Sequence, residues 1–135
     1  MVTLDKVNRN DGASSMKVDY DLAGKGLAGV ELAIIPDNWS ERQGIELWLK
    51  PIGQKNGLTV QIFEEDGEAW KYSMESAAGA EGQIIKIPFS RLTVTGTKKD
   101  GMLDLGAIVK IGLYAGTGAG KQGKGTMYID TIQLY

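Results

Sequence analysis

The sequence predicts an all-β fold, an antiparallel β-sandwich of the jelly-roll type with about nine short strands. Two observations lead to this prediction. Apolar and polar residues alternate with a period of two through most of the apolar segments, which is typical of strands with one buried face. Turn residues, mainly Gly, Asp and Asn, separate these segments at short intervals, and no segment carries a long helical pattern.

Each strand is expected from its own pattern, and in order they are 2–7, 14–22, 26–35, 44–50, 57–65, 68–74, 82–89, 107–115 and 125–135. Segment 26–35 is apolar almost throughout, which predicts a more fully buried strand. In segment 44–50 the core face is expected to hold Ile45, Leu47 and Leu49. In segment 107–115 the alternation places Val109, Ile111 and Leu113 in the core and Ile108, Lys110 and Tyr114 outside.

The hairpin at 57–74 has two possible registers, and the register decides where Trp70 lies. A three-residue loop ending on Gly67 pairs Ile62 with Trp70, which directs the aromatic ring to the core. A two-residue turn pairs Phe63 with Trp70 instead and forces Lys71 inward, which costs free energy. We expect the first register, with Trp70, Tyr72 and Met74 on the core side.

Composition excludes several classes of function. The chain has 135 residues, a net charge of −2, no cysteine and no histidine. One domain spanning 1–135 is expected, and its abrupt start and end favour a module excised from a longer protein. The balanced charge and the absence of a long apolar run predict no nucleic-acid or membrane partner. Without histidine or cysteine, nucleophilic triads are excluded, which counts against an enzyme.

The glycine-rich segment "YAGTGAGKQGKG" (114–125) contains a G-x-G-x-x-G match at 118–123. A dinucleotide site needs a helix after such a loop, so that the helix N-terminus meets the phosphates. Here a strand pattern follows, and Gln122 stands where a phosphate-binding loop has Ser or Thr. The segment therefore predicts a hairpin loop.

Aromatic residues on outer strand faces are the best binding candidates. Trp48 lies between Glu46 and Lys50 on the face opposite three aliphatic core positions. It could stack on a sugar ring while Glu46 and Lys50 bond the sugar hydroxyls, or it could lie beneath a loop. Tyr114 has a similar place, with Gly112 allowing close approach. The further candidates are Trp39 and Arg42 on the loop before segment 44–50, and Gln61 on the outer face of segment 57–65.

Acidic residues supply two other hypotheses. Asp130, inside an apolar strand, should be partly buried and needs either a hydrogen bond to a backbone amide or a calcium ion. Asp5, Asp11 or Glu31 could supply further ligands if the first strands lie alongside the last. Paired carboxylates could support a glycosidase, for which Glu31 and Glu46 are better placed than the acidic turn at 64–68, whose side chains are expected to be solvated.

Several motifs occur in an order that resembles a known family. They are Trp48 and Lys50 in the "LWLK" strand, "DGEAW" at 66–70, "IPFS" at 87–90 and "YIDTIQL" at 128–134. From Ser14 onward the chain resembles carbohydrate-binding modules of the galactose-binding-like jelly-roll type, similar to those of family eleven appended to bacterial β-glucanases and mannanases.

This resemblance implies a secreted, non-catalytic module, a monomer tethered to a glycoside hydrolase. It implies that a concave sheet face binds one β-glucan or β-mannan chain by aromatic stacking and hydrogen bonds. It also implies a structural calcium ion at Asp130, although the usual acidic partner near the N-terminus is missing, which leaves Asp5 for that role. The alternatives are a protein-interaction domain of the same fold and, less favoured, a small glycosidase.

Overall fold

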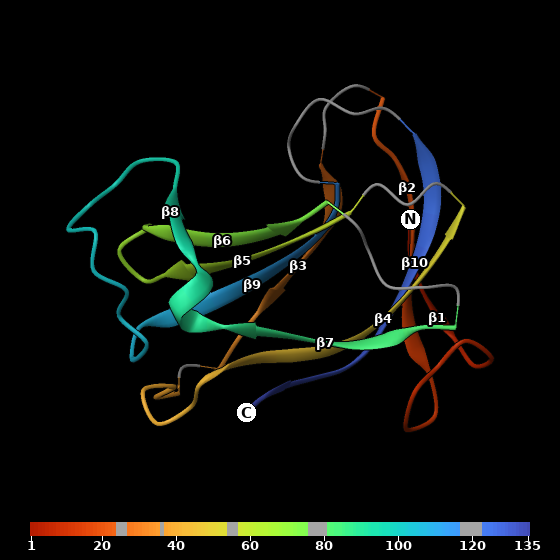
Figure 1. Cartoon of the computed structure of the whole chain (residues 1–135), viewed down its shortest axis with the longest axis horizontal. Coiled ribbons are helices and arrows are strands. Elements are labelled where there is room, and N and C mark those ends of the chain that lie inside the picture. The colour runs from red at the N-terminus through yellow and green to blue at the C-terminus, as the bar shows by residue number, and fades with distance from the viewer. Residues whose placement is uncertain (24–26, 36, 54–56, 76–80, 117–122) are drawn as a thin grey trace.

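The computed structural model describes residues 1–23, 27–35, 37–53, 57–75, 81–116 and 123–135. This part of the chain forms ten strands and one 3₁₀ turn, η1 (Phe89–Arg91), arranged as two antiparallel sheets that pack face to face (Figure 1). The predicted all-β sandwich is confirmed. Among the described residues there is no helix of the length and apolarity that a membrane span requires.

Sheet A contains β1 (Val2–Asp5), β2 (Ser15–Asp21), β10 (Lys124–Leu134), β4 (Gly44–Gly53) and β7 (Gln83–Pro88), in that order. Sheet B contains β3 (Ala28–Ala33), β9 (Ile108–Ala115), β5 (Leu58–Glu64), β6 (Ala69–Met74) and β8 (Thr93–Thr95). Strand β8 was not predicted, because its three residues are too few to show an alternation.

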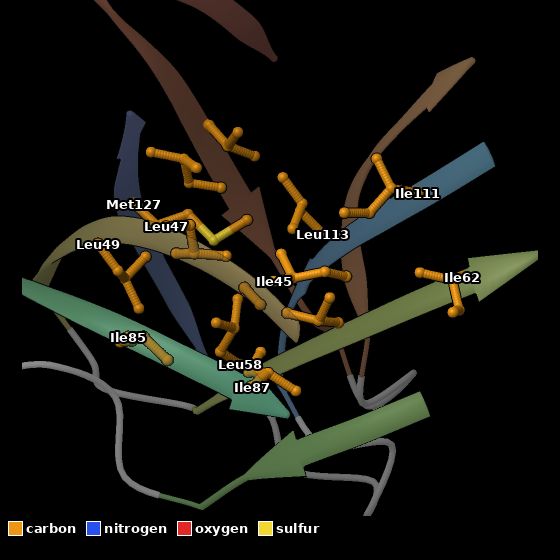
Figure 2. Close-up of a cluster of buried hydrophobic side chains, with 14 of the residues drawn as sticks. Ile45, Leu47, Leu49, Leu58, Ile62, Ile85, Ile87, Ile111, Leu113 and Met127 are labelled. Atoms are coloured by element: carbon orange, nitrogen blue, oxygen red, sulfur yellow. The ribbon is translucent and has the colours of Figure 1, made fainter. Parts of the chain in front are cut away.

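The core lies between the two sheets, where aliphatic side chains from both inner faces meet (Figure 2). Ile45, Leu47 and Leu49 of β4 are each at most 1% exposed, as the alternation in that segment predicts. Ile85 and Ile87 of β7 and Met127 of β10 also lie on the sheet A side, with further core residues from β2, and β5 and β9 contribute to the sheet B side.

Strand β3 corrects one expectation, because it is not fully buried. Gly29, Glu31 and Ala33 are exposed, while the residues between them pack against the core. The physical reason is its place in the sheet. Within the described structure β3 pairs with β9 alone, so it is an edge strand with one open face.

Strand β9 corrects a second expectation at its first two residues. Ile108 is fully buried and Val109 is only partly buried, the reverse of the predicted order. The register of β5 against β9 shifts between Phe63 and Glu64, so one extra residue bulges and the alternation changes phase there.

The β5–β6 hairpin has the predicted three-residue register. Ile62 pairs with Trp70 and Val60 with Tyr72, and Gly67 takes the positive φ of 91° that the loop requires. Trp70, Tyr72 and Met74 pack against the core as partly buried residues. The glycine segment at 118–123 lies largely outside the described residues.

Candidate functional site

The outer face of sheet B is a largely polar surface that also carries the aromatic residues Tyr114 and Phe63, and it is here called the Tyr114 face. Strand pairing places Glu31 beside Gly112, Gly112 beside Gln61, and Gln61 beside Lys71, in a row that crosses four strands. The neighbouring rows bring the remaining side chains to the same face, namely Lys110, Tyr114, Thr59, Phe63 and Ser73.

Tyr114 lies flat on this face. A Cβ atom built on Gly112 would lie 2.5 Å from Cε2 and 2.6 Å from Cζ of Tyr114, so the ring covers the glycine. The two residues are two positions apart in β9 and therefore share a face. Because Gly112 has no side chain, the half-buried ring rests against the strand backbone and can turn its other side outward.

Glu31 holds the ring in this position. The Tyr114 hydroxyl donates to Glu31 Oε1 at 2.7 Å, and Lys110 Nζ lies 2.7 Å from Glu31 Oε2. Lys110 also sits over the Phe63 ring, 4.1 Å from its centroid. Hydrogen bonds from Lys110 and Tyr114 keep the pKa of Glu31 below its usual value, while burial and the bond to Glu31 raise the pKa of Tyr114.

Polar side chains lie beside the ring on β5, although Thr59 is fully buried. Thr59 Oγ1 lies 2.8 Å from Ser73 Oγ and donates to the carbonyl oxygen of Gly116 at 2.8 Å. The half-buried Gln61 side chain makes no hydrogen bond to the described part of the chain, so its amide can serve a ligand. The predicted residues Tyr114 and Gln61 thus lie on one face, beside Glu31 and Lys110, which were not predicted to bind sugar.

Trp48 does not belong to this face, and the expectation that its ring is exposed is wrong. It points out from sheet A but is only 7% exposed. It is paired with Ile84 of β7 and Asp130 of β10, and Gly82 packs against the indole. Gly82, directly before β7, favours the alternative that Trp48 lies beneath a loop, and the buried indole offers little surface to a ligand.

Trp39 is also buried, although it lies on the predicted loop. It is 5% exposed and stacks on Phe89 with ring centroids 6.0 Å apart. Arg42 remains exposed on the same loop, where its backbone N–H donates to the carbonyl oxygen of Trp39 at 2.9 Å. A loop position alone therefore did not reveal that this aromatic side chain turns into the core.

The other two candidates next to Trp48 have partners on the outer face of sheet A. Glu46 forms an ion pair with Lys86 at 3.4 Å and accepts a hydrogen bond from Gln133. Lys50 Nζ donates to Asn8 Oδ1 at 2.8 Å. Glu46 and Glu31 project from opposite outer faces of the sandwich, so they cannot flank one glycosidic bond.

The acidic hairpin at 64–68 corrects another expectation. Solvated side chains were predicted, and Glu65 and Asp66 are exposed, but Glu64 is 5% exposed and Glu68 is fully buried. Glu64 accepts from Trp70 Nε1 at 2.8 Å and from the Asp104 backbone at 3.0 Å, and Glu68 accepts from the Gly101 backbone at 3.1 Å. Burial raises the pKa of Glu64. These carboxylates bind backbone N–H groups of the segment before β9. Those partners lie more than 30 residues away in the sequence, so a local pattern could not reveal them.

Asp130 and Asp5 face N–H groups. Asp130 Oδ2 accepts from the backbones of Asn10 at 2.9 Å and Asp11 at 3.0 Å, and Oδ1 accepts from Thr131 at 2.7 Å. Asp5 Oδ1 accepts from the backbones of Val7 and Asn8. Calcium needs six to eight oxygen ligands, about 2.3–2.6 Å away. In the described residues no group of three or more acidic side chains gathers as a metal site, and the oxygens of Asp130 and Asp5 face N–H donors instead.

An apolar cleft of about 410 Å³ opens at the end of the sandwich between β3 and β10. Its walls include Leu32, Ile34, Trp39 and Leu134, and among the described residues that line it Gln133 alone has a side chain of polar type. A sugar has a hydroxyl on most ring carbons and needs many hydrogen-bonding partners. The Tyr114 face supplies them and the cleft does not.

The structure is similar to two solved carbohydrate-binding modules. One is a family 11 module from Clostridium thermocellum in complex with a β-1,3-1,4-mixed-linked tetrasaccharide, with a TM-score of 0.75, 24% identity, and coverage of 99% of this chain and 82% of that chain. The other is the family 11 module of the cellulosomal cellulase Lic26A-Cel5E of Clostridium thermocellum. Its TM-score is 0.71 at 23% identity, and the match covers 99% of this chain and 81% of that chain.

A third similar structure is an exo-β-agarase, with a TM-score of 0.68 and 17% identity over all of this chain but 22% of that chain. Neither a scan against protein-family models nor a search of curated proteins finds a match. The likeness confirms the resemblance to family 11 modules at the level of the fold, over nearly the whole chain.

Proposed function

We propose that the chain is a non-catalytic module that binds a β-linked polysaccharide, a β-glucan or β-mannan chain, on the Tyr114 face. The observation that carries this proposal is the Tyr114 ring, laid flat over Gly112 and held by Glu31 within a polar sheet face. The oligosaccharide bound to a structural neighbour of the same fold supports the ligand class.

Two kinds of contact would act together. The apolar C–H face of a pyranose stacks on the Tyr114 ring, which Glu31 holds in place before the ligand arrives, so little side-chain entropy is lost on binding. Gln61, Lys71 and the Glu31–Lys110 pair then exchange hydrogen bonds with the sugar hydroxyls. Since these groups also give up water, the net affinity is modest.

The module performs no chemistry in this proposal. In place of catalysis, it raises the local concentration of polysaccharide for an attached glycoside hydrolase, outside the cell. The ion pairs of Glu31 with Lys110 and of Glu46 with Lys86, on opposite faces, support the non-catalytic role. The proposal has the chain as a monomer within a larger secreted protein.

Affinity gel electrophoresis of wild type and Tyr114→Ala tests the proposal. The gels would contain barley β-glucan, glucomannan, galactomannan, xylan, hydroxyethylcellulose or agarose. We expect one backbone class to retard the wild type. Loss of the stacking ring should cost about 1–3 kcal/mol, by analogy with base stacking on aromatic residues, and weaken binding about 5- to 150-fold.

Tyr135→Ala is the matched control, because it removes a tyrosine ring that contacts Lys86 on the other sheet. Retardation that is lost in the control but kept in Tyr114→Ala would move the site to the outer face of sheet A. If no polymer retards the wild type, the protein-interaction domain becomes the leading alternative.

A further inference from the structure

The loop between β1 and β2, residues 6–14, lies on the outer face of sheet A. Two side chains of that face bind it: Lys50 donates to Asn8 Oδ1 at 2.8 Å, and Asp130 accepts from the backbones of Asn10 and Asp11. Asn10 Nδ2 also donates to Thr131 Oγ1 at 3.2 Å. The loop therefore has fixed contacts to strands that are 42 to 121 residues away in the sequence.

The Arg9 side chain links the two ends of this loop. Arg9 Nε donates to the carbonyl oxygen of Lys6 at 3.0 Å, and Arg9 Nη1 donates to the carbonyl oxygen of Gly12. The guanidinium group thus holds two backbone oxygens of one loop at once. Its planar fork of N–H donors is suited to this, whereas an ammonium group is a compact point charge.

Carboxylates complete the arrangement on either side. Asp5 Oδ1 binds the backbone N–H groups of Val7 and Asn8 where the loop begins, and Asp130 Oδ2 binds those of Asn10 and Asp11 further along. Two loop carbonyls, of Lys6 and Gly12, therefore face a cation, and four loop amides face carboxylates, so these backbone groups have partners.

We propose that Arg9 takes the place of a loop-ordering divalent cation in this chain, so that residues 6–14 are held on sheet A by protein contacts and need no calcium. A bound ion would have to collect the carbonyl oxygens and carboxylates that now face N–H donors. The guanidinium group supplies the positive charge and the carbonyl contacts that such an ion would provide. An ion would also link the loop to the Asp130 carboxylate, and here the backbone N–H groups of Asn10 and Asp11 bind that carboxylate directly.

Hydrogen exchange of the Asn10 and Asp11 amides, with and without excess EDTA, tests the proposal directly. We expect both amides of the wild type to be protected equally in the two buffers, with an unchanged Tm. In Arg9→Ala the two amides should exchange about 3- to 10-fold faster, and the Leu113 amide in β9 should stay protected. The Tm should fall by about 2–5 °C.

Lys6→Ala is the matched control, since it removes one positive charge from the same loop but keeps the carbonyl that Arg9 binds. Arg9→Lys keeps the charge but lacks the fork, so its amides should also exchange faster than those of the wild type. The proposal is overturned if EDTA speeds exchange in the wild type. It is equally overturned if Arg9→Ala and Lys6→Ala have the same effect.

Discussion

At the scale of single residues, the aromatic side chains separate into a structural group and a binding candidate. Trp39 and Trp48 are 5% and 7% exposed, while Tyr114 is half-buried with its ring on an open sheet face. Alternation placed both Trp48 and Tyr114 on outer faces, and both placements hold. The difference comes from what covers each face, because Trp48 lies against Gly82 and Ile84.

Trp48→Ala should therefore affect folding more than binding. Removing a buried indole leaves a cavity, and the free energy of unfolding should fall by about 3 kcal/mol or more. Urea unfolding measures the loss, and affinity electrophoresis of the folded fraction should show unchanged retardation. Trp48→Phe, which leaves a smaller cavity, serves if the alanine variant does not fold. Normal stability together with lost retardation would return Trp48 to the binding site.

At the scale of elements, β9 shows how one strand serves both the core and the proposed site. Ile111 and Leu113 pack between the sheets, while Lys110, Gly112 and Tyr114 form the centre of the Tyr114 face. Gly112 leaves room for the Tyr114 ring, because any side chain at this position would occupy the same space. Gly29 in neighbouring β3 has a different neighbour, the backbone of Leu113 and Tyr114.

Substitution by alanine should distinguish the two glycines. In Gly112→Ala the new Cβ meets the movable end of Tyr114, so stability should change by about 0.5 kcal/mol or less while glycan affinity falls toward that of Tyr114→Ala. In Gly29→Ala the Cβ meets rigid backbone, and stability should fall by about 1–3 kcal/mol. Denaturant unfolding and affinity electrophoresis of both variants check this. Full affinity in Gly112→Ala would contradict the proposed role of the ring.

At the scale of the whole molecule, the charge state is steady near neutral pH. The chain has no histidine and no cysteine. Four carboxyls in the described structure have a pKa below the usual value, namely Asp5, Asp19, Glu31 and Asp130. For Asp130 partial burial acts in the opposite direction, but N–H donors from Asp11, Asn10 and Thr131 outweigh it.

Stability and binding should therefore vary little between about pH 5 and pH 9 and fall in acid. A carboxyl whose pKa is lowered by folding stabilises the protein above its unfolded-state pKa, and that contribution is lost as the pH falls through the folded-state pKa. Glu64 opposes this trend, because its pKa is raised and its protonation favours the folded state. Four carboxyls with a lowered pKa outnumber the one with a raised pKa, so we expect the Tm to decrease when the pH is below about 4.

Calorimetry across this range gives the Tm, and affinity electrophoresis at pH 5, 7 and 9 gives the binding. Glu31 stays ionised and Tyr114 stays protonated over this window, because folding lowers the pKa of the first and raises that of the second. A large change in affinity between pH 5 and pH 9 would mean that a different titrating group controls the site.

Local patterns determined much of this protein before any tertiary contact was known. A period of two assigned the core faces of β4, β5 and β7, and Gly67 settled the register of the β5–β6 hairpin. Both are local effects, since side chains alternate along any strand and a turn requires a particular backbone geometry. The same patterns placed Tyr114 and Gln61 on outer faces.

Tertiary structure decided which outer face stays open and which residues meet on it. Glu31 reaches Tyr114 across 83 residues of sequence, and Asp130 reaches the Asn10 amide across 120. The bulge that reversed Ile108 and Val109 likewise arises from pairing with another strand. Such contacts join segments that are distant in the chain, so they cannot be predicted from a local pattern. Where strands pair in regular register, the sequence by itself therefore determined which way the side chains point. The pairing and packing of the two sheets decided the exceptions at Ile108, Val109 and Trp39, and what each side chain meets.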